Sequence, residues 1–170
     1  MANFDEALVF VLRNEDPHLS GVLTEDSGGR TRFGIAERFH PDLGDDFYTG
    51  PPEAALRTAR EIYRSEYWKP ICGDEIEDQR VAAKLLDMAV NMGVRQAIVL
   101  CQRAVNASAT FHLDEDGALG EQTLAAINEC DPALLVIHLR EISEDFYQQV
   151  AAKRPASQQY LRGWLARAKA

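Results

Sequence analysis

The chain has 170 residues, of which 46% are hydrophobic and 26% charged, a composition typical of a globular protein rather than a disordered one. The formal net charge of −9 argues against a nucleic-acid partner, because phosphates require a basic surface. The longest apolar runs reach only about six residues, too few for a membrane-spanning helix, and the early acidic residues Asp5 and Glu6 do not fit a secretory signal. The cysteines and histidines are scattered, so we expect reduced thiols, no metal site and no cofactor.

The spacing of apolar residues predicts a mostly α-helical fold with one small β-hairpin after the first helix. The first helix is expected to start at an Asn3 cap and to end near Glu15, because Pro17 removes the residue before it from the helical region. Two extended segments, 19–23 and 31–35, flank a glycine-rich turn and form the hairpin. Further helices are predicted at 51–68, 81–92, 94–105, 121–128 and 131–150, and around Tyr160 to Leu165.

The charge is unevenly distributed along the chain. From Lys153 onward there are five basic residues and no acidic ones, whereas the first 152 residues hold 13 basic and 27 acidic residues. This basic end either contacts an anionic polymer or places cations at the favourable end of a helix dipole.

Glu15 occupies an unusual place in the first helix. At about 100° per residue, it falls on the same helix face as Phe4, Leu8 and Val11, so it continues an apolar stripe at the last turn. Desolvation and the negative end of the helix dipole would raise the pKa of its carboxyl there. A carboxyl that stays protonated near neutral pH is what a glycosidic leaving group needs from a general acid. The alternative is a glutamate that turns into solvent.

An ordered set of motifs follows Glu15. Its members are Asp26-Ser27-Gly28-Gly29-Arg30-Thr31-Arg32-Phe33-Gly34-Ile35, Tyr67-Trp68, Asp87-Met88-Ala89-Val90-Asn91-Met92-Gly93, Gln102-Arg103-Ala104-Val105, Asp116-Gly117-Ala118-Leu119-Gly120-Glu121-Gln122-Thr123 and Gly163-Trp164-Leu165-Ala166-Arg167. Together with Glu15 this set resembles glycoside hydrolase family 108, the N-acetylmuramidases of the lysozyme superfamily, in which a Glu ends the first helix and an Asp-x-Gly-Gly-x-Thr-x-x-Gly-Ile hairpin follows. The family has Glu-Gly-Gly-Tyr at the catalytic residue, whereas this chain has Glu15-Asp16-Pro17-His18.

The resemblance covers nearly the whole chain and implies two regions. Residues 1–92 would form a lysozyme-like catalytic region, and residues 93–170 a helical peptidoglycan-binding region packed into the same globule. Glu15 would be the general acid. Asp26 would activate a water molecule from the opposite face of the sugar, or it would shape the hairpin as an Asx-turn residue.

Five more residues are candidates for binding the glycan. Thr31 either positions water or sugar or serves only the hairpin. Tyr67 and Trp68 offer flat faces on which sugars stack, although at least one of them is expected in the core. Asp87 and Asn91 lie one turn apart on a helix face, where they either line a glycan cleft or brace the core.

The predicted function is hydrolysis of the β-1,4 bond between N-acetylmuramic acid and N-acetylglucosamine in the glycan strands of peptidoglycan. Two alternatives stay open: a lytic transglycosylase, which uses the same acid and leaves an anhydro end, and a non-catalytic cell-wall-binding module. The resemblance also implies an endolysin-like, bacteriolytic role. The protein would be made in the cytoplasm without a signal peptide and would reach the wall through a holin-like pore or a specialised secretion route.

Overall fold

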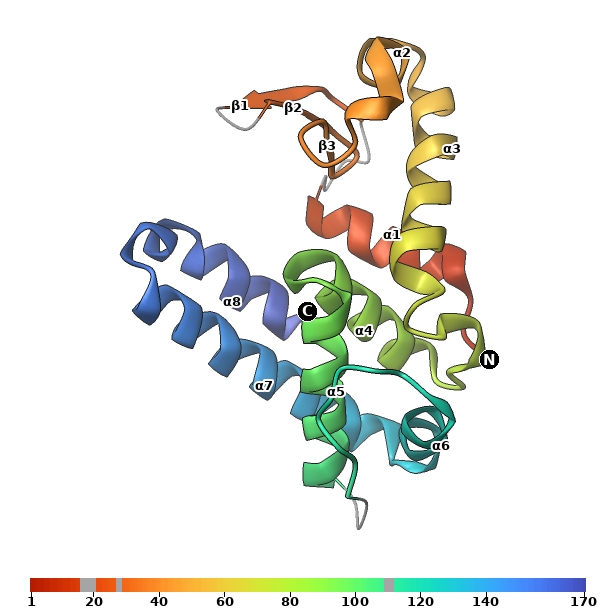
Figure 1. The fold of residues 1–170 in the computed structure, drawn as a ribbon, viewed down its shortest axis with the longest axis vertical. Coiled ribbons are helices and arrows are strands. Elements are labelled where there is room, and N and C mark those ends of the chain that lie inside the picture. The colour runs from red at the N-terminus through yellow and green to blue at the C-terminus, as the bar shows by residue number, and fades with distance from the viewer. Residues whose placement is uncertain (16–20, 27–28, 109–111) are drawn as a thin grey trace.

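The computed structural model describes residues 1–15, 21–26, 29–108 and 112–170, without the side chains of Glu15, Asp26 and Ser108. The fold is mostly α-helical with one small antiparallel sheet, as predicted (Figure 1). The helices are α1 (Phe4–Glu15), α2 (Gly44–Thr49), α3 (Pro52–Tyr63), α4 (Gln79–Met92), α5 (Val94–Ser108), α6 (Glu121–Glu129), α7 (Pro132–Lys153) and α8 (Leu161–Lys169). The strands are β1 (Thr24–Asp26), β2 (Gly29–Arg32) and β3 (Ile35–Ala36). No helix within the described residues is long and apolar enough to cross a membrane.

Short polar side chains set the starts of three long helices. Asn3, Asp78 and Asp131 precede α1, α4 and α7, and one side-chain oxygen of each accepts two backbone N–H groups of the following turn at 2.8–3.2 Å. These bonds satisfy donors that have no partner within the helix. The cap predicted at Asn3 is therefore confirmed.

The core is built around α4. This helix packs against α1, α5 and α7, and every residue from Val81 to Ala89 is buried. A helix buried on all sides lies at the centre of a fold, so α4 joins the first part of the chain to the C-terminal helices. Figure 1 shows the sheet, α2 and α3 gathered at one end, with α7 and α8 running side by side elsewhere.

The sheet has the order β1-β2-β3 and differs in position from the predicted hairpin. Asp26 pairs with Gly29, so β1 and β2 are joined by a two-residue connection, and the strands begin at Thr24 and Gly29 rather than at residues 19 and 31. The third strand was not predicted. It forms because Phe33 and Gly34 both have positive φ angles, 49° and 75°, which reverse the chain after β2.

A π-helix at Arg64–Trp68 continues α3 and places the fully buried Trp68 against Gly73. A Cβ atom at Gly73 would lie 2.3 Å from the indole ring, closer than real contacts allow. The backbone therefore passes the ring at a distance that only glycine permits.

Candidate active site

Glu15 is the last residue of α1. Phe4, Leu8 and Val11, which precede it on the same helix face, are at most 4% exposed, so the predicted apolar stripe lies in the core. The backbone of Glu15 thus stands at the end of a stripe that faces the interior. The side chain of Glu15 and the environment predicted for it lie outside the described residues.

Asp26 and Thr31 lie on neighbouring strands beyond α1. Asp26 ends β1, and Thr31 is half-buried in β2, where it pairs with Thr24. The Oγ1 of Thr24 donates to the carbonyl oxygen of Thr31 at 3.3 Å. The side chain of Asp26, on which both of its predicted roles depend, lies outside the described residues.

An arginine on β2 holds the sheet against its surroundings. Arg30 donates to Glu37 at 2.9 Å, pairs with Asp45 at 2.7 Å, and lies 4.7 Å from the centre of the Tyr48 ring. The guanidinium lowers the pKa of the Glu37 carboxyl below its ordinary value through the hydrogen bond between them. The sheet is thereby attached to the segment that enters α2.

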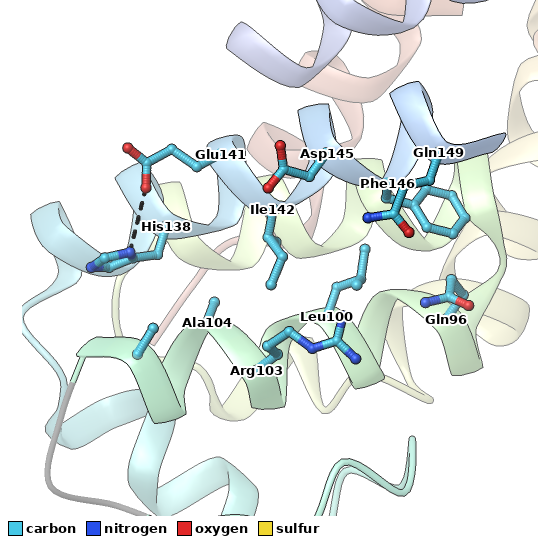
Figure 2. A pocket seen from close by; sticks show the side chains of 11 residues that line it. Gln96, Leu100, Arg103, Ala104, His138, Glu141, Ile142, Asp145, Phe146 and Gln149 are labelled. Carbon is cyan, nitrogen blue, oxygen red and sulfur yellow. Dashed lines mark ion pairs between the residues drawn. The ribbon is translucent and has the colours of Figure 1, made fainter. Parts of the chain in front are cut away.

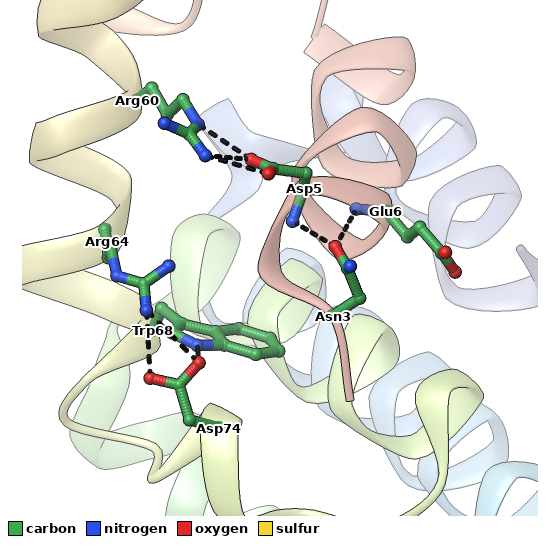
Figure 3. A network of polar contacts seen from close by, with 7 residues as sticks. All are labelled: Asn3, Asp5, Glu6, Arg60, Arg64, Trp68 and Asp74. Carbon is green, nitrogen blue, oxygen red and sulfur yellow. Dashed lines mark hydrogen bonds and ion pairs between the residues drawn. The ribbon is translucent and has the colours of Figure 1, made fainter. Parts of the chain in front are cut away.

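Trp68 belongs to the core and not to a sugar-binding surface. Its ring is fully buried 5.5 Å from the ring of Phe4, and its Nε1–H donates to Asp74 at 2.9 Å (Figure 3). A ring with no exposed face cannot stack on a sugar, which corrects the expectation for this residue. The neighbouring Tyr67 is half-buried and lies 5.8 Å from Tyr63, so part of its surface remains open to a ligand.

Asp87 is also an interior residue. It is 1% exposed on α4, and its Oδ1 accepts hydrogen bonds from Asn14 of α1 at 2.9 Å and from Arg167 of α8 at 2.8 Å. The Lys84 ammonium lies 3.9 Å from Oδ2. Of the two roles predicted for Asp87, bracing the core is the one that its burial supports, whereas Asn91 on the same helix is half-buried.

Residues 21–93 match the family model of glycosyl hydrolase 108, and residues 96–169 match that of a predicted peptidoglycan domain. Over residues 21–93 the chain is therefore similar to glycosyl hydrolase family 108. Residues 96–169 are similar to a predicted peptidoglycan domain, and the two matches together support a glycoside hydrolase that acts on peptidoglycan.

The solved structure of SagA from Brucella abortus is similar over 97% of this chain and 92% of that one, with a TM-score of 0.65 and 22% sequence identity. This likeness shows a shared fold. No curated protein sequence matches the chain. The family 108 match begins at Gly21, so it includes Asp26, Thr31 and Tyr67 but starts after Glu15.

The predicted peptidoglycan domain carries an open groove between α5 and α7, with a volume of about 520 Å³ (Figure 2). Its floor includes Leu100, Ile142 and Phe146. Its edges carry both charge signs, with Arg103 on α5 and Glu141 and Asp145 on α7. Such a groove offers apolar contacts and opposite charges to one ligand.

A polar turn supports the same domain next to α5. The Gln102 side chain is 1% exposed, accepts from the N–H of Gly117 at 2.9 Å and donates to Asp116 at 2.8 Å. Asp116 in turn accepts from the N–H of Ala118 at 2.9 Å. These bonds hold the turn on α5, so Asp116 has a structural role.

The cysteines have no visible part in the chemistry. Cys72, Cys101 and Cys130 are free, and burial raises the pKa of the Cys101 thiol to about 12. Among the described residues, no three His, Cys, Asp or Glu side chains gather in a way that could hold a metal ion.

The contacts of Asn14, Lys84 and Arg167 were not predicted from the sequence. Lys84 did carry a signal, because it stands alone within the apolar run of residues 81–86. A lysine at such a position must either reach solvent or find buried partners. It is 2% exposed, and its hydrogen-bond acceptors come from α8.

Proposed function

We propose that this peptidoglycan hydrolase is an N-acetylmuramidase that hydrolyses the β-1,4 bond between N-acetylmuramic acid and N-acetylglucosamine. The observation that carries the proposal is the position of Glu15: it is the last residue of α1, one turn beyond the buried Val11, and it stands before the segment that leads into the sheet matched by family 108. An acid at the edge of an apolar interior is suited to stay protonated until the leaving group takes its proton.

In the proposed mechanism Glu15 donates its proton to the glycosidic oxygen as the bond to the sugar breaks. Asp26, at the end of β1, accepts a proton from the water molecule that attacks the anomeric carbon. Thr31 on β2 and the exposed part of Tyr67 would position the sugars between them. No step in this mechanism requires a metal or an organic cofactor.

We further propose that the groove between α5 and α7 binds the polymer away from the cleaved bond. Peptidoglycan stem peptides carry carboxylates, amines and methyl groups. The edges of the groove supply Glu141, Asp145 and Arg103, and its floor is apolar, so both kinds of stem-peptide group find a counterpart. In the same proposal the protein is made in the cytoplasm and acts on the wall in the periplasm after release, through a holin-like pore or a secretion route.

The test combines Glu15→Gln with product analysis. Glutamine has nearly the volume and helix propensity of glutamate but cannot donate the proton, so turnover should fall by about 10²–10⁴-fold while folding and sacculus binding remain. Mass spectrometry of digested sacculi separates the reactions, because a muramidase releases reducing ends and a transglycosylase releases anhydro ends one water lighter. Anhydro products would show that the protein is a lytic transglycosylase and not a hydrolase. Wild-type turnover by folded Glu15→Gln would exclude Glu15 as the acid, and binding without any release of fragments by the wild type would indicate a non-catalytic wall-binding module.

A further inference from the structure

Three helices meet at the Asp87 carboxylate. Asn14, from the last turn of α1, donates its Nδ2–H to Oδ1 at 2.9 Å. Arg167, from the last turn of α8, donates its Nε–H to the same oxygen at 2.8 Å. The two donors are separated from Asp87 by 73 and 80 residues of sequence, so the cluster exists only when both halves of the chain are folded together.

Lys84 also holds the end of α8, through hydrogen bonds to its backbone. Its ammonium donates to the carbonyl oxygens of Arg167 at 3.0 Å and of Ala168 at 2.7 Å. Carbonyl groups at the C-terminal end of a helix lack partners within the helix, so a buried cation is a favourable donor for them. The last turn of α8 is thus held on α4 through its backbone as well as through the Arg167 side chain.

The Asp87 carboxylate faces two cations in this cluster, and these charges are costly to bury. Burial raises the pKa of the Asp87 carboxyl, and the nearby Arg167 and Lys84 cations oppose that rise. Arg140 and Glu144 of α7 add one charge of each sign near Lys84. Apolar side chains of similar volume commonly pack such a site with equal or greater stability. Directional hydrogen bonds do what apolar contacts do not: they set the orientation of the groups that they join.

The hydrogen bond from Asn14 orients the last turn of α1, which carries Glu15. Asn14 is the residue before Glu15 in α1, and its side chain contacts Asp87 from that last helical turn. A bond at this point limits how far the end of α1 can rotate or fray, which helix ends otherwise do readily. The bond partner, Asp87, is itself held by a residue of the predicted peptidoglycan domain.

We propose that Arg167 is a positioning residue for the general acid. Acting through Asp87 and Asn14, it orients the last turn of α1, so the C-terminal helix of the predicted peptidoglycan domain completes the catalytic centre of the family 108 half. This inference rests on the proposed role of Glu15 as the acid. It assigns to α8 a part in the chemistry that is separate from holding the polymer.

The first experiment uses Asn14→Ala, which removes the bond to α1 and leaves the Asp87–Arg167 pair in place. Asn14 is exposed, so the variant should fold. With a soluble glycan strand as substrate, kcat should fall by about 10–100-fold at nearly unchanged KM, as expected when a supporting residue of a reacting group is lost. The pH profile of kcat should also move, because a displaced acid has a different environment. Each variant is assayed well below its own melting temperature.

The second variant, Asp87→Asn with Arg167→Met, removes the two charges of this pair together, while the buried Lys84 keeps the carbonyl oxygens of residues 167 and 168 as acceptors. We expect a similar loss of kcat. The matched control is Asp5→Asn with Arg60→Met, an arginine–carboxylate pair that joins the exposed N-terminal end of α1 to α3 with hydrogen bonds of 2.7 and 2.8 Å (Figure 3). The control should keep kcat within about twofold, since surface ion pairs contribute little.

The outcomes separate the two proposals. If Glu15→Gln is inactive while folded Asn14→Ala has wild-type kcat and pH profile, the positioning role is excluded and the acid assignment stands. If the control loses as much kcat as Asn14→Ala, the effect comes from the general integrity of α1, and the positioning role is again excluded. If Glu15→Gln remains active, the proposed function itself fails.

Discussion

Arg32 and Gly21 are joined by a hydrogen bond of 2.9 Å from the arginine Nε to the glycine carbonyl oxygen. Arg32 is 5% exposed, and its Nη1 also donates to the carbonyl oxygens of Phe47 and Gly50, both at 2.9 Å. One buried guanidinium therefore connects the chain before β1, the strand β2 and both sides of the α2 C-terminus. Together with Arg30, this residue holds the sheet in place.

Arg32→Met should consequently destabilise the protein by about 2–4 kcal/mol, because several buried carbonyl groups would lose their donor. The stability of Arg32→Lys should lie between those of the wild type and Arg32→Met, because an ammonium lacks the planar arrangement of donors that reaches several carbonyls at once. Urea denaturation of the three proteins measures both values. A loss below about 0.5 kcal/mol for Arg32→Met would mean that water satisfies these carbonyls.

Asp26→Asn tests the second carboxylate. If Asp26 activates water, turnover should fall by about 10²–10⁴-fold, because an amide cannot accept the proton. The neighbouring Glu25→Gln, an exposed residue of the same strand, serves as the control and should change turnover little. Turnover of Asp26→Asn within a few-fold of wild type would assign Asp26 to shaping the turn.

The burial of Lys84 predicts that the folded protein becomes more stable as the pH rises above about 8. Burial lowers the pKa of its ammonium from 10.5 to about 8, so the unfolded chain binds the proton more tightly than the folded one. Between these two values stability should rise with pH, by at most about 1.4 kcal/mol per pH unit, and below pH 8 this contribution should be constant. Urea denaturation from pH 7 to 9.5 should show this rise in the wild type and not in Lys84→Met. Parallel curves for the two proteins would exclude Lys84 as its source.

The basic C-terminal end should help to hold the wall at low ionic strength. Reversing the exposed residues Arg162 and Lys169 to Glu should weaken binding to sacculi, and the difference should shrink as salt is added. Arg57→Glu with Lys69→Glu, also exposed, changes the net charge equally on the other half of the molecule. If both double variants bind equally at low salt, the net charge of the protein determines binding, and the C-terminal end has no special role.

The groove between α5 and α7 has its own test. Glu141→Lys with Asp145→Lys reverses the charge of one exposed edge, so binding to sacculi should weaken by several-fold while Arg103 and the apolar floor remain. Glu121→Lys with Glu129→Lys on α6 is the matched control for net charge and should bind at least as well as the wild type. Co-sedimentation measures both, and unchanged binding of the first variant would remove the groove from the proposal.

Local signals in the sequence predicted most of the helices. Asn3 and Asp131 precede helices as capping residues do, and the apolar face of α1 is evident from Phe4, Leu8 and Val11, so these elements follow from spacing alone. Helix α2 was missed because Gly44–Thr49 is six residues long and contains poor helix formers. It forms where the buried Phe47 and Tyr48 pack, which is a tertiary effect.

The candidate site was less predictable, for a different reason. Periodicity shows which face of a helix is apolar but not which residues from elsewhere meet it, so the partners of Asp87 could not be inferred from spacing. Tyr67 and Trp68 are adjacent aromatic residues, and the sequence contains no feature that distinguishes them. Their environments differ because the π-helix places Trp68 in the core beside Asp74 and leaves Tyr67 partly exposed.

The close approach of Gly73 to the Trp68 indole has a consequence for the evolution of this fold. Because any side chain at position 73 would overlap the ring, the two positions are not free to change independently. A lineage that retains the tryptophan must retain the glycine, whereas one that has replaced the tryptophan with a smaller residue can accept alanine or serine at position 73. Among homologues the two positions should therefore covary, and their joint identity would mark which members keep this packing of the π-helix.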